Sequence, residues 1–485
     1  MKKYLIVFTV LISAITFAQR PISLEEAIKI AQQNSPDYKA LLNQNQASYW
    51  RYRNFKARFL PQLRFDATLP QYRNSVSSQE LDDGSIGFRR SKFTRLDGTL
   101  SLNQNIPLTG GTFSVSSQLE RVDVNQPIAG INYAVVPFSI NYRQNSLFYN
   151  EFKWLKEIEP LLYEEAKREF IERMEEISLN TCRRYFSLLR AQIQKRIAKS
   201  NLSNQDTLFQ ISKGRYKMGK IAENDLLQIE LSVLNSRNNL TTQEINFKRS
   251  SQNLSRYLVL DTENILLSTP QELSLFDVTV EKALEEAKSN RKAVIEFRRR
   301  RLQAEQDVAE VKGNNRLQMS LRANFGISQQ NDNFNNLFQD FGQQQSLTLT
   351  LGMPILDWGV TKSRRKLVEA NKDLVNTNVE IDEQEFEQEI YLHILNWQNQ
   401  RNFLETAKKA QEIALKRYEI AKKRFVLGKI NITDLNIALQ EQDRSVISYL
   451  NSLEKFWVDY YTLRRLTLYD FIENKKIEVK DIIYD

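Results

Sequence analysis

The chain of 485 residues has one cysteine and one histidine, and only 14 glycines and 10 prolines. Cys182 has no partner for a disulfide within the chain. A single histidine, His393, excludes a histidine-based catalytic triad and a multi-histidine metal site within one chain. His393 stands beside apolar residues and Cys182 sits in a helical pattern, so we interpret both as packed side chains. A glycine-rich phosphate-binding loop is also lacking. We therefore expect no catalysis, no metal and no cofactor.

Long apolar runs are missing beyond the N-terminus. No run of about 20 apolar residues follows residue 18, which predicts the absence of a transmembrane helix. Residues 1–18 have two lysines, then a short apolar stretch, then the small residue Ala18, as in a signal peptide. The polar segment that follows argues against an uncleaved anchor. We expect cleavage before Gln19 and export from the cytoplasm.

The net charge of +9 is spread along the chain with acidic residues interleaved, which is typical of solvated helix faces. One basic run, "FRRRRLQAEQ" at 297–306, departs from this pattern. We interpret it as a helix surface in preference to a lipid or polyanion contact. Export and the lack of a concentrated basic, aromatic-laced patch argue against nucleic-acid binding.

Several segments of about ten residues alternate apolar and polar side chains. In 347–355, leucines and other apolar residues alternate with threonine, glycine and proline, and 317–327 follows the same rule. Residues 96–103 and the stretch after "TGG" at 109–111 do so in the first half of the chain. This period of two predicts strands with one apolar face. Taken alone, the strands fit a transmembrane β-barrel wall or a half-buried sheet in a soluble domain.

Two long stretches, 150–260 and 358–470, read as helix with essentially one break each. The breaks are "KMGKIAE" and "VLGKINI". The longest helical limbs would reach about 90 Å at about 1.5 Å per residue, which is too long for a globular core to cover. After Asp434 the apolar residues recur at alternating spacings of four and three, as in coiled coils. We expect a pair of long helical hairpins.

The chain is duplicated. "RYKMGKIAENDL" at 215–226 and "RFVLGKINITDL" at 424–435 share six of twelve residues at an offset of 209. "SLEEAIKIAQQNS" from residue 23 matches "TVEKALEEAKSNR" from residue 279 at an offset of 256. The difference of 47 places that many extra residues in the first copy, between Ala67 and Phe138. Two similar halves, each with strands followed by a helical hairpin, are therefore expected.

These features together resemble the TolC family of outer-membrane efflux and secretion channels. The resemblance rests on the export signal, the "SLEEAIKIAQQNSPDYKA" opening, "ARFLPQLRF" before the strands, the duplication and the two glycine–lysine turns. It implies a homotrimer in the outer membrane, with a 12-stranded β-barrel, four strands per chain, continued by a periplasmic α-helical barrel. It also implies a periplasmic adaptor and an inner-membrane transporter as partners. The fold class is thus α+β. The extra block is a departure from the family pattern, and the sequence leaves open whether it widens the barrel or forms an extracellular or periplasmic hairpin.

The resemblance also implies roles for the turns. Gly219, Lys220, Gly428 and Lys429 correspond to the tips where an adaptor docks, although a glycine that simply ends a helix would look the same.

Asp225 and Asp434 correspond to aspartates that ring the periplasmic aperture, where carboxylates would favour cations. Their alternative role is helix capping or a first-turn acid. The family's tyrosine and arginine partners of the first aspartate fall on Phe425 and Ile430, so that latch is not expected here.

A periplasmic adaptor or a coiled-coil adhesin is the competing interpretation, because such proteins also contain helical hairpins. Amphipathic strands in both halves argue against it.

The resulting division of the chain is: 1–18, signal peptide; 19–58, N-terminal periplasmic helical segment; 59–149, strands of the first repeat with an extra β-hairpin block; 150–260, first helical hairpin with its tip near 218–222; 261–278, equatorial linker; 279–314, helix opening the second repeat; 315–357, strands of the second repeat; 358–470, second helical hairpin with its tip near 427–431; 471–485, C-terminal tail.

Overall fold

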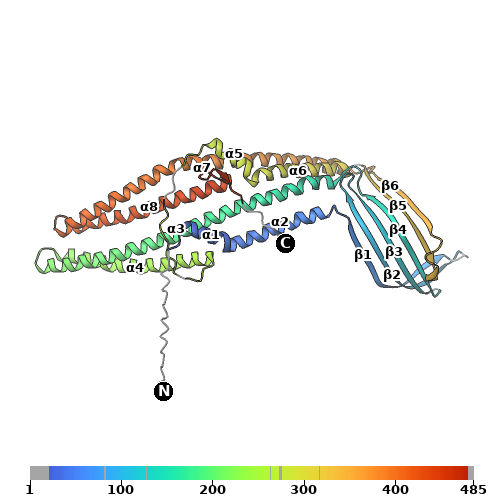
Figure 1. Ribbon diagram of the computed structural model, residues 1–485, viewed down its shortest axis with the longest axis horizontal. Helices are drawn as coiled ribbons and strands as arrows, with labels where there is room; N and C mark the ends of the chain where they lie inside the picture. The colour runs from blue at the N-terminus through green and yellow to red at the C-terminus, as the bar shows by residue number, and fades with distance from the viewer. Residues whose placement is uncertain are drawn as a thin grey trace, which may run out of the picture. The chain divides into compact units, whose positions relative to one another are not determined.

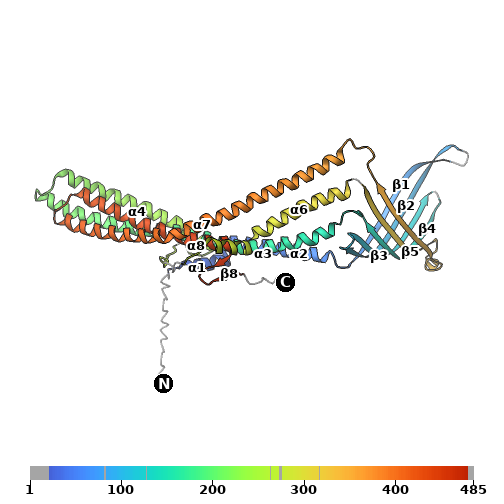
Figure 2. The same cartoon turned by 90° about the horizontal axis from the view of Figure 1, so that it is seen from above.

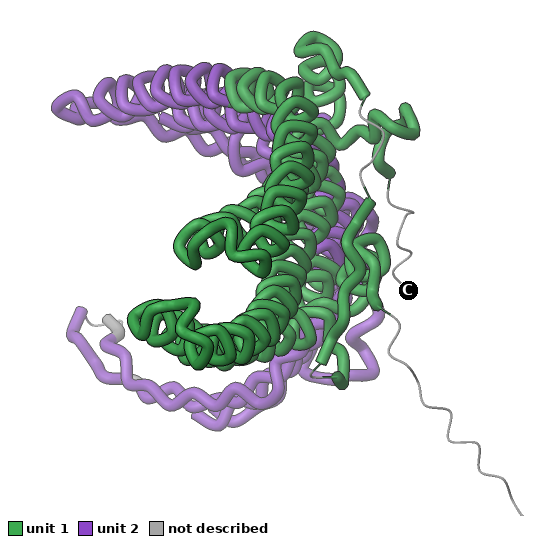
Figure 3. Tube along the Cα trace, turned by 90° about the vertical axis from the view of Figure 1, so that its left-hand side faces the viewer, with its two compact units in different colours: residues 1–44, 168–291, 386–485 green, residues 45–167, 292–385 purple. Residues whose placement is uncertain are grey.

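The computed structural model of the chain describes residues 21–80, 84–126, 128–262, 264–271, 276–315 and 317–478 (Figure 1). The expected signal peptide, 1–18, lies outside the described residues. The described chain divides into two compact units, shown in different colours in Figure 3. Unit 1 comprises 1–44, 168–291 and 386–485, and unit 2 comprises 45–167 and 292–385. No described helix is long and apolar enough to cross a membrane.

Unit 2 contains a six-stranded sheet in which the strands lie side by side in chain order (Figure 1). Every neighbouring pair is antiparallel. The strands are β1 (Gln62–Glu80), β2 (Ile86–Ile106), β3 (Gly111–Gln126), β4 (Gly130–Gln144), β5 (Gln318–Asn331) and β6 (Gly342–Gly352). Strands β1 and β6 are the two edges.

The register separates apolar from polar residues on the two faces of the sheet. One cross-strand row contains Leu63, Leu102, Val115, Ile140 and Phe325. The next row, on the opposite face, contains arginine, serine and glycine: Arg64, Ser101, Ser116, Ser139 and Gly326. Successive residues of a strand point to opposite faces, so the alternation in the sequence becomes one apolar and one polar face.

The apolar face is exposed in this chain. Leu63 is 69% exposed and Phe65 is 68% exposed, and Leu347, Leu349 and Leu351 are also exposed. A sheet in a soluble domain normally buries such a face against a second layer. An apolar face that stays exposed across neighbouring strands indicates contact with another apolar medium or chain.

The first repeat contributes four strands to the sheet and the second repeat contributes two. In the repeat alignment, "PQLRFDA" at 61–67 matches "LQMSLRA" at 317–323, so β1 corresponds to β5. "FSINYRQNSLF" at 138–148 matches "SLTLTLGMPIL" at 346–356, so β4 corresponds to β6. The extra block of the first repeat is therefore the β2–β3 hairpin, which lies inside the sheet between β1 and β4. The resemblance implies four strands per chain, and this hairpin brings the number in the sheet to six.

The helical segments of unit 2 come from α2, α3, α6 and α7 and lie side by side in that order (Figure 2). Tyr52 of α2 (Pro36–Ala57) stacks on Tyr163 of α3 (Glu151–Lys217). In the basic run, Arg299 of α6 (Lys292–Asn314) binds Glu165 of α3 at 2.6 Å, and Arg301 binds Glu383 of α7 (Val360–Val426) at 2.8 Å. The arginine run therefore joins α6 to both of its neighbours.

Unit 1 contains the ends of two helical hairpins. The first joins α3 to α4 (Glu223–Leu258), and the second joins α7 to α8 (Ile432–Thr467). The short helices α1 (Leu24–Asn34) and α5 (Val280–Asn290) open the two repeats and are capped alike, by Ser23 and Thr279. The remaining elements are η1 (Phe334–Asn336) in unit 2 and the short strands β7 (Tyr469–Asp470) and β8 (Lys475–Lys476) in unit 1.

One glycine-to-alanine pair tests the packing of α6 against the start of α3. A Cβ on Gly313 would lie 2.8 Å from the carbonyl oxygen of Phe148, whereas a Cβ on Gly214 in α3 would meet nothing within 4 Å. Gly214→Ala should stabilise the protein by up to about 1 kcal/mol, as alanine does in helices. Gly313→Ala should destabilise it by about 1–3 kcal/mol, because the backbone must move. Guanidinium unfolding of the detergent-solubilised protein checks this, and a stabilising Gly313→Ala would contradict the close approach.

Candidate functional site

Both hairpin tips are built by the same backbone motif. At the first tip, the amide of Gly219 donates to the carbonyl of Tyr216 at 2.8 Å, and the amide of Lys220 donates to Arg215 at 2.9 Å. At the second tip, Gly428 and Lys429 make the equivalent bonds, both at 2.9 Å. Gly219 and Gly428 have φ of 69° and 73°. This is the Schellman arrangement, which needs a left-handed residue after the helix and so favours glycine.

The two tips differ in what surrounds the glycine. The space next to Gly219 is open, with no heavy atom within 4 Å of a Cβ position. At Gly428 the guanidinium of Arg215 fills that space, with Nη2 2.6 Å from the Cβ position. The same guanidinium donates from Nη1 to the carbonyl of Phe425 at 3.4 Å. It lies at the C-terminal end of α7, where the helix dipole favours a positive charge.

An apolar cluster joins the two hairpins just behind the tips. Its members come from α3, α4, α7 and α8: Leu208, Ile229, Tyr418, Phe425, Ile432, Leu435 and Ala438. Phe425 is 7% exposed, whereas its repeat counterpart Tyr216 is 40% exposed. Ile430 packs against the cluster as well. The two positions where the family has polar partners thus take part in apolar packing, and the cluster holds the hairpins together by burial.

Asp225 and Asp434 lie in the first turns of α4 and α8. Neither is the N-cap. Asn431 caps α8 and accepts a hydrogen bond from the amide of Asp434 at 2.8 Å, and Ala222 precedes α4 without a side-chain cap. Within the described part of the chain neither aspartate forms an ion pair, and Asp434 is exposed. A negative charge in the first turn is favoured by the helix dipole.

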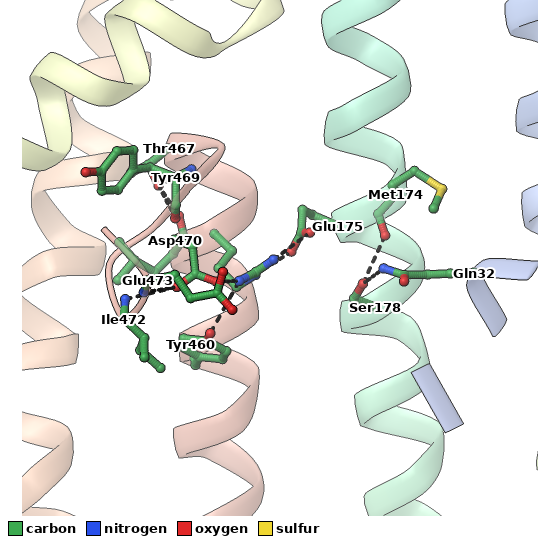
Figure 4. Close-up of polar contacts among 12 residues, drawn as sticks. Gln32, Met174, Glu175, Ser178, Tyr460, Thr467, Tyr469, Asp470, Ile472 and Glu473 are labelled. Carbon is green, nitrogen blue, oxygen red and sulfur yellow. Dashed lines mark hydrogen bonds and ion pairs between the residues drawn. The ribbon is translucent and has the colours of Figure 1, made fainter. Parts of the chain in front are cut away.

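The sequence analysis did not identify a buried ion network in unit 1. Arg464 of α8 binds Glu175 of α3 at 2.9 and 3.1 Å, and it also contacts Asp470. Asp470 in turn accepts from the amides of Ile472 and Glu473, which fixes the turn before β8 (Figure 4). Burial opposes the charge of Arg464, but the hydrogen bond and charge of Glu175 hold its pKa above the usual range.

The single histidine and cysteine are both packed residues in unit 1. The His393 ring lies with Nε2 2.9 Å from the carbonyl oxygen of Asp459, and burial lowers the pKa of His393. Cys182 is fully buried, and burial raises the pKa of its thiol. A buried, protonated thiol is a poor nucleophile.

Comparison with known proteins agrees with this arrangement. Residues 283–467 match the family model of the outer membrane efflux protein. The CmeC outer membrane channel of Campylobacter jejuni is 13% identical, with a TM-score of 0.66 over 94% of this chain and 87% of CmeC. The outer membrane protein VceC of Vibrio cholerae is 14% identical, with a TM-score of 0.63 over 94% of this chain and 97% of VceC. CusC, known from structures describing transmembrane channel formation, is 15% identical, with a TM-score of 0.63 over 92% of this chain and 91% of CusC. No curated protein sequence matches the chain.

The fold is therefore that of the outer-membrane channels, with a strand sheet and long helices, and the α+β fold class is confirmed. The match to the outer membrane efflux protein model falls within the second repeat, and the resemblance found in the sequence is confirmed. The matching family model describes an efflux protein and CmeC is an outer membrane channel, which agrees with the expectation that the chain is not an enzyme.

Proposed function

We propose that this protein forms a trimeric outer-membrane duct for efflux or type I secretion. The observation that carries this proposal is the sheet with one exposed apolar face, one polar face and two open edges. Lipid would cover the apolar face and water would fill the side of the polar face. An open strand edge is not tolerated in hydrocarbon, so copies of the chain must close the sheet.

In this proposal the helical hairpins extend into the periplasm and form a second barrel. A periplasmic adaptor docks at the tips, on Gly219, Lys220, Gly428 and Lys429, and an inner-membrane transporter loads the substrate. Support comes from the exposure of both lysines and both glycines at the ends of the hairpins. The open space next to Gly219 would admit a partner backbone, whereas Arg215 occupies that space at Gly428.

Asp225 and Asp434 would line the periplasmic aperture. Their carboxylates do not serve as caps or ion-pair partners within the described chain, so they remain available to face the lumen. Rings of carboxylates contributed by several copies attract cations and repel anions.

Selectivity in planar bilayers tests the duct and the aspartates together. We expect the purified protein to form cation-preferring pores. Asp225→Asn combined with Asp434→Asn should reduce the cation-to-anion permeability ratio by about twofold or more, because the ring charge is removed. Glu281→Gln, at an exposed first-turn acid of α5, is the matched control and should leave the ratio unchanged.

Two results would count against this proposal in different ways. If the double variant keeps the wild-type permeability ratio, the aspartates are first-turn acids only. If the protein neither inserts into bilayers nor fractionates with the outer membrane, the duct is wrong and a periplasmic adaptor or an adhesin becomes the better interpretation.

A further inference from the structure

We propose that the β2–β3 hairpin of the first repeat widens the membrane wall to eighteen strands, six from each of three copies. The inference rests on the proposed duct. Each open edge of the sheet pairs with a second copy of this chain. The resulting barrel has one and a half times as many strands as the twelve-stranded barrel that the resemblance implies.

The hairpin is paired as an integral part of the sheet on both of its sides. Strand β2 pairs with β1 from Gln62↔Asn103 to Glu80↔Ile86, and β3 pairs with β4 from Thr112↔Arg143 to Val124↔Gly130. A hairpin that folded away from the wall would leave β1 and β4 to pair with each other. Instead the ladders extend along nearly the full length of both strands.

The turn of this hairpin is held by hydrogen bonds from residues that precede α3. The side-chain amide of Asn150, the residue before α3, donates to the carbonyls of Pro107 and Leu108 at 2.8 and 3.2 Å. The side-chain amide of Gln144 donates to the carbonyl of Thr109 at 2.7 Å. These bonds hold the turn where the chain passes from the last strand of the first repeat into the helix.

Two glycines allow this close fit. Gly110 has φ of 83°, and a Cβ there would lie 2.9 Å from Oδ1 of Asn150. A Cβ on Gly111 would lie 2.5 Å from the hydroxyl of Tyr142. The "TGG" turn of the extra block thus lies in close contact with Asn150 and Tyr142. An insertion attached loosely to the sheet would not need glycine at these two positions.

The other side of the hairpin is fastened to the chain that enters β1. The side-chain amide of Gln104 donates to the carbonyl of Phe59 at 2.8 Å. The side-chain amide of Asn105 donates to the carbonyl of Arg58 at 2.9 Å. The hairpin is therefore bonded at its base to the segments on both sides of it in the sheet.

The edges of the sheet permit closure by further copies. Six alternating strands leave β1 and β6 running in opposite directions, so β6 of one copy can pair antiparallel with β1 of the next. Residues of β6 are exposed along almost the whole strand. Such a head-to-tail contact generates a ring when the rotation between copies closes, as the proposed duct requires.

The width of six strands suits the helical layer of the same unit. With strands about 4.8 Å apart and tilted by about 40°, six strands span about 38 Å of circumference and four span about 25 Å. Four helices packed 8–10 Å apart span roughly 32–40 Å. Unit 2 has four such helical segments. With the added hairpin, the width of the six strands is therefore close to the width of these four helices. Three copies would give a barrel about 36 Å across between strand backbones, against about 24 Å for twelve strands.

Electron cryo-microscopy of the full-length protein in lipid nanodiscs tests the strand number directly. We expect eighteen strands in cross-sections of the membrane region. Twelve strands would overturn the inference while leaving the duct intact, whether two copies close the ring or the hairpin lies outside it. A protein that does not enter nanodiscs as a ring would instead overturn the proposed function.

A disulfide test in the outer membrane provides an independent measurement. In a Cys182→Ala background, Ser116→Cys with Ser139→Cys places two thiols on facing residues of β3 and β4. Oxidation should cross-link most of the protein within the chain, detected as a mobility shift on non-reducing gels. The control pair, Ser116→Cys with Asn132→Cys, is far out of register and should not cross-link. Equal, low yields for both pairs would show that the hairpin is not part of the wall.

Discussion

Arg464→Gln is expected to destabilise the protein by about 3–5 kcal/mol, because it leaves the buried carboxylate of Glu175 without its partner. The Glu175 side chain is only 4% exposed and receives two hydrogen bonds from Arg464. Arg465→Gln is the matched control. Arg465 is the next residue, lies 3.5 Å from Glu176 and is more exposed, so its loss should cost about 1 kcal/mol or less. Guanidinium unfolding of the detergent-solubilised protein, followed by tryptophan fluorescence, measures both.

The mechanism behind this prediction can be checked with a second variant. If the cost comes from an unpaired buried charge, Arg464→Met combined with Glu175→Met and Asp470→Asn should recover much of the lost stability, since an apolar pair of similar size replaces the ions. Similar effects of Arg464→Gln and Arg465→Gln would contradict the assignment of Arg464 as the residue that joins α8, α3 and the turn before β8.

Phe425→Ala should loosen the two hairpin tips, whereas Tyr216→Ala at the corresponding position of the first repeat should not. Removing a buried phenylalanine ring costs about 3–5 kcal/mol, which corresponds to a loss of about a hundredfold or more in amide protection of the tips. Tyr216 is 40% exposed, so its removal should change protection by about tenfold or less. Hydrogen exchange of peptides covering 418–440 in the detergent-solubilised protein gives the comparison.

The two tip variants also separate apolar packing from turn formation. Both leave the Schellman bonds of the backbone in place, so protection that stays unchanged in both variants would show that the turns alone hold the tips. In the proposed duct, a loosened tip should also raise the open-pore conductance for Phe425→Ala only.

The sequence predicted the local elements well because their patterns are local. The alternation in 347–355, the two helical hairpins and the glycine turns each follow from residues close together in the chain. The drop in repeat offset also located the extra residues between Ala67 and Phe138. It did not place them in the sheet, because strand pairing depends on contacts far apart in the sequence.

The candidate site residues divide in the same way. The glycine turns could be predicted because Gly219 and Gly428 belong to a repeated motif, but the difference between them depends on Arg215, which lies more than 200 residues from Gly428. The bond between Arg464 and Glu175 joins residues 289 apart, and each stands among many other charges on helix faces. Phe425 and Ile430 were expected only to lack a polar latch, and their shared apolar cluster became visible when four helices were brought together.

The antiparallel order of β1–β6 also limits how the number of strands in the proposed membrane barrel can change. The chain enters β1 from α2 and leaves β6 toward α7. Because the six strands alternate in direction, the start of β1 and the end of β6 lie at the same end of the strands. Adding one strand would send everything that follows to the opposite side of the membrane, including a long, charged helical hairpin that cannot cross a bilayer. Width can therefore change only by whole hairpins, and the insertion of β2–β3 is the smallest step that preserves the sidedness of the rest of the chain.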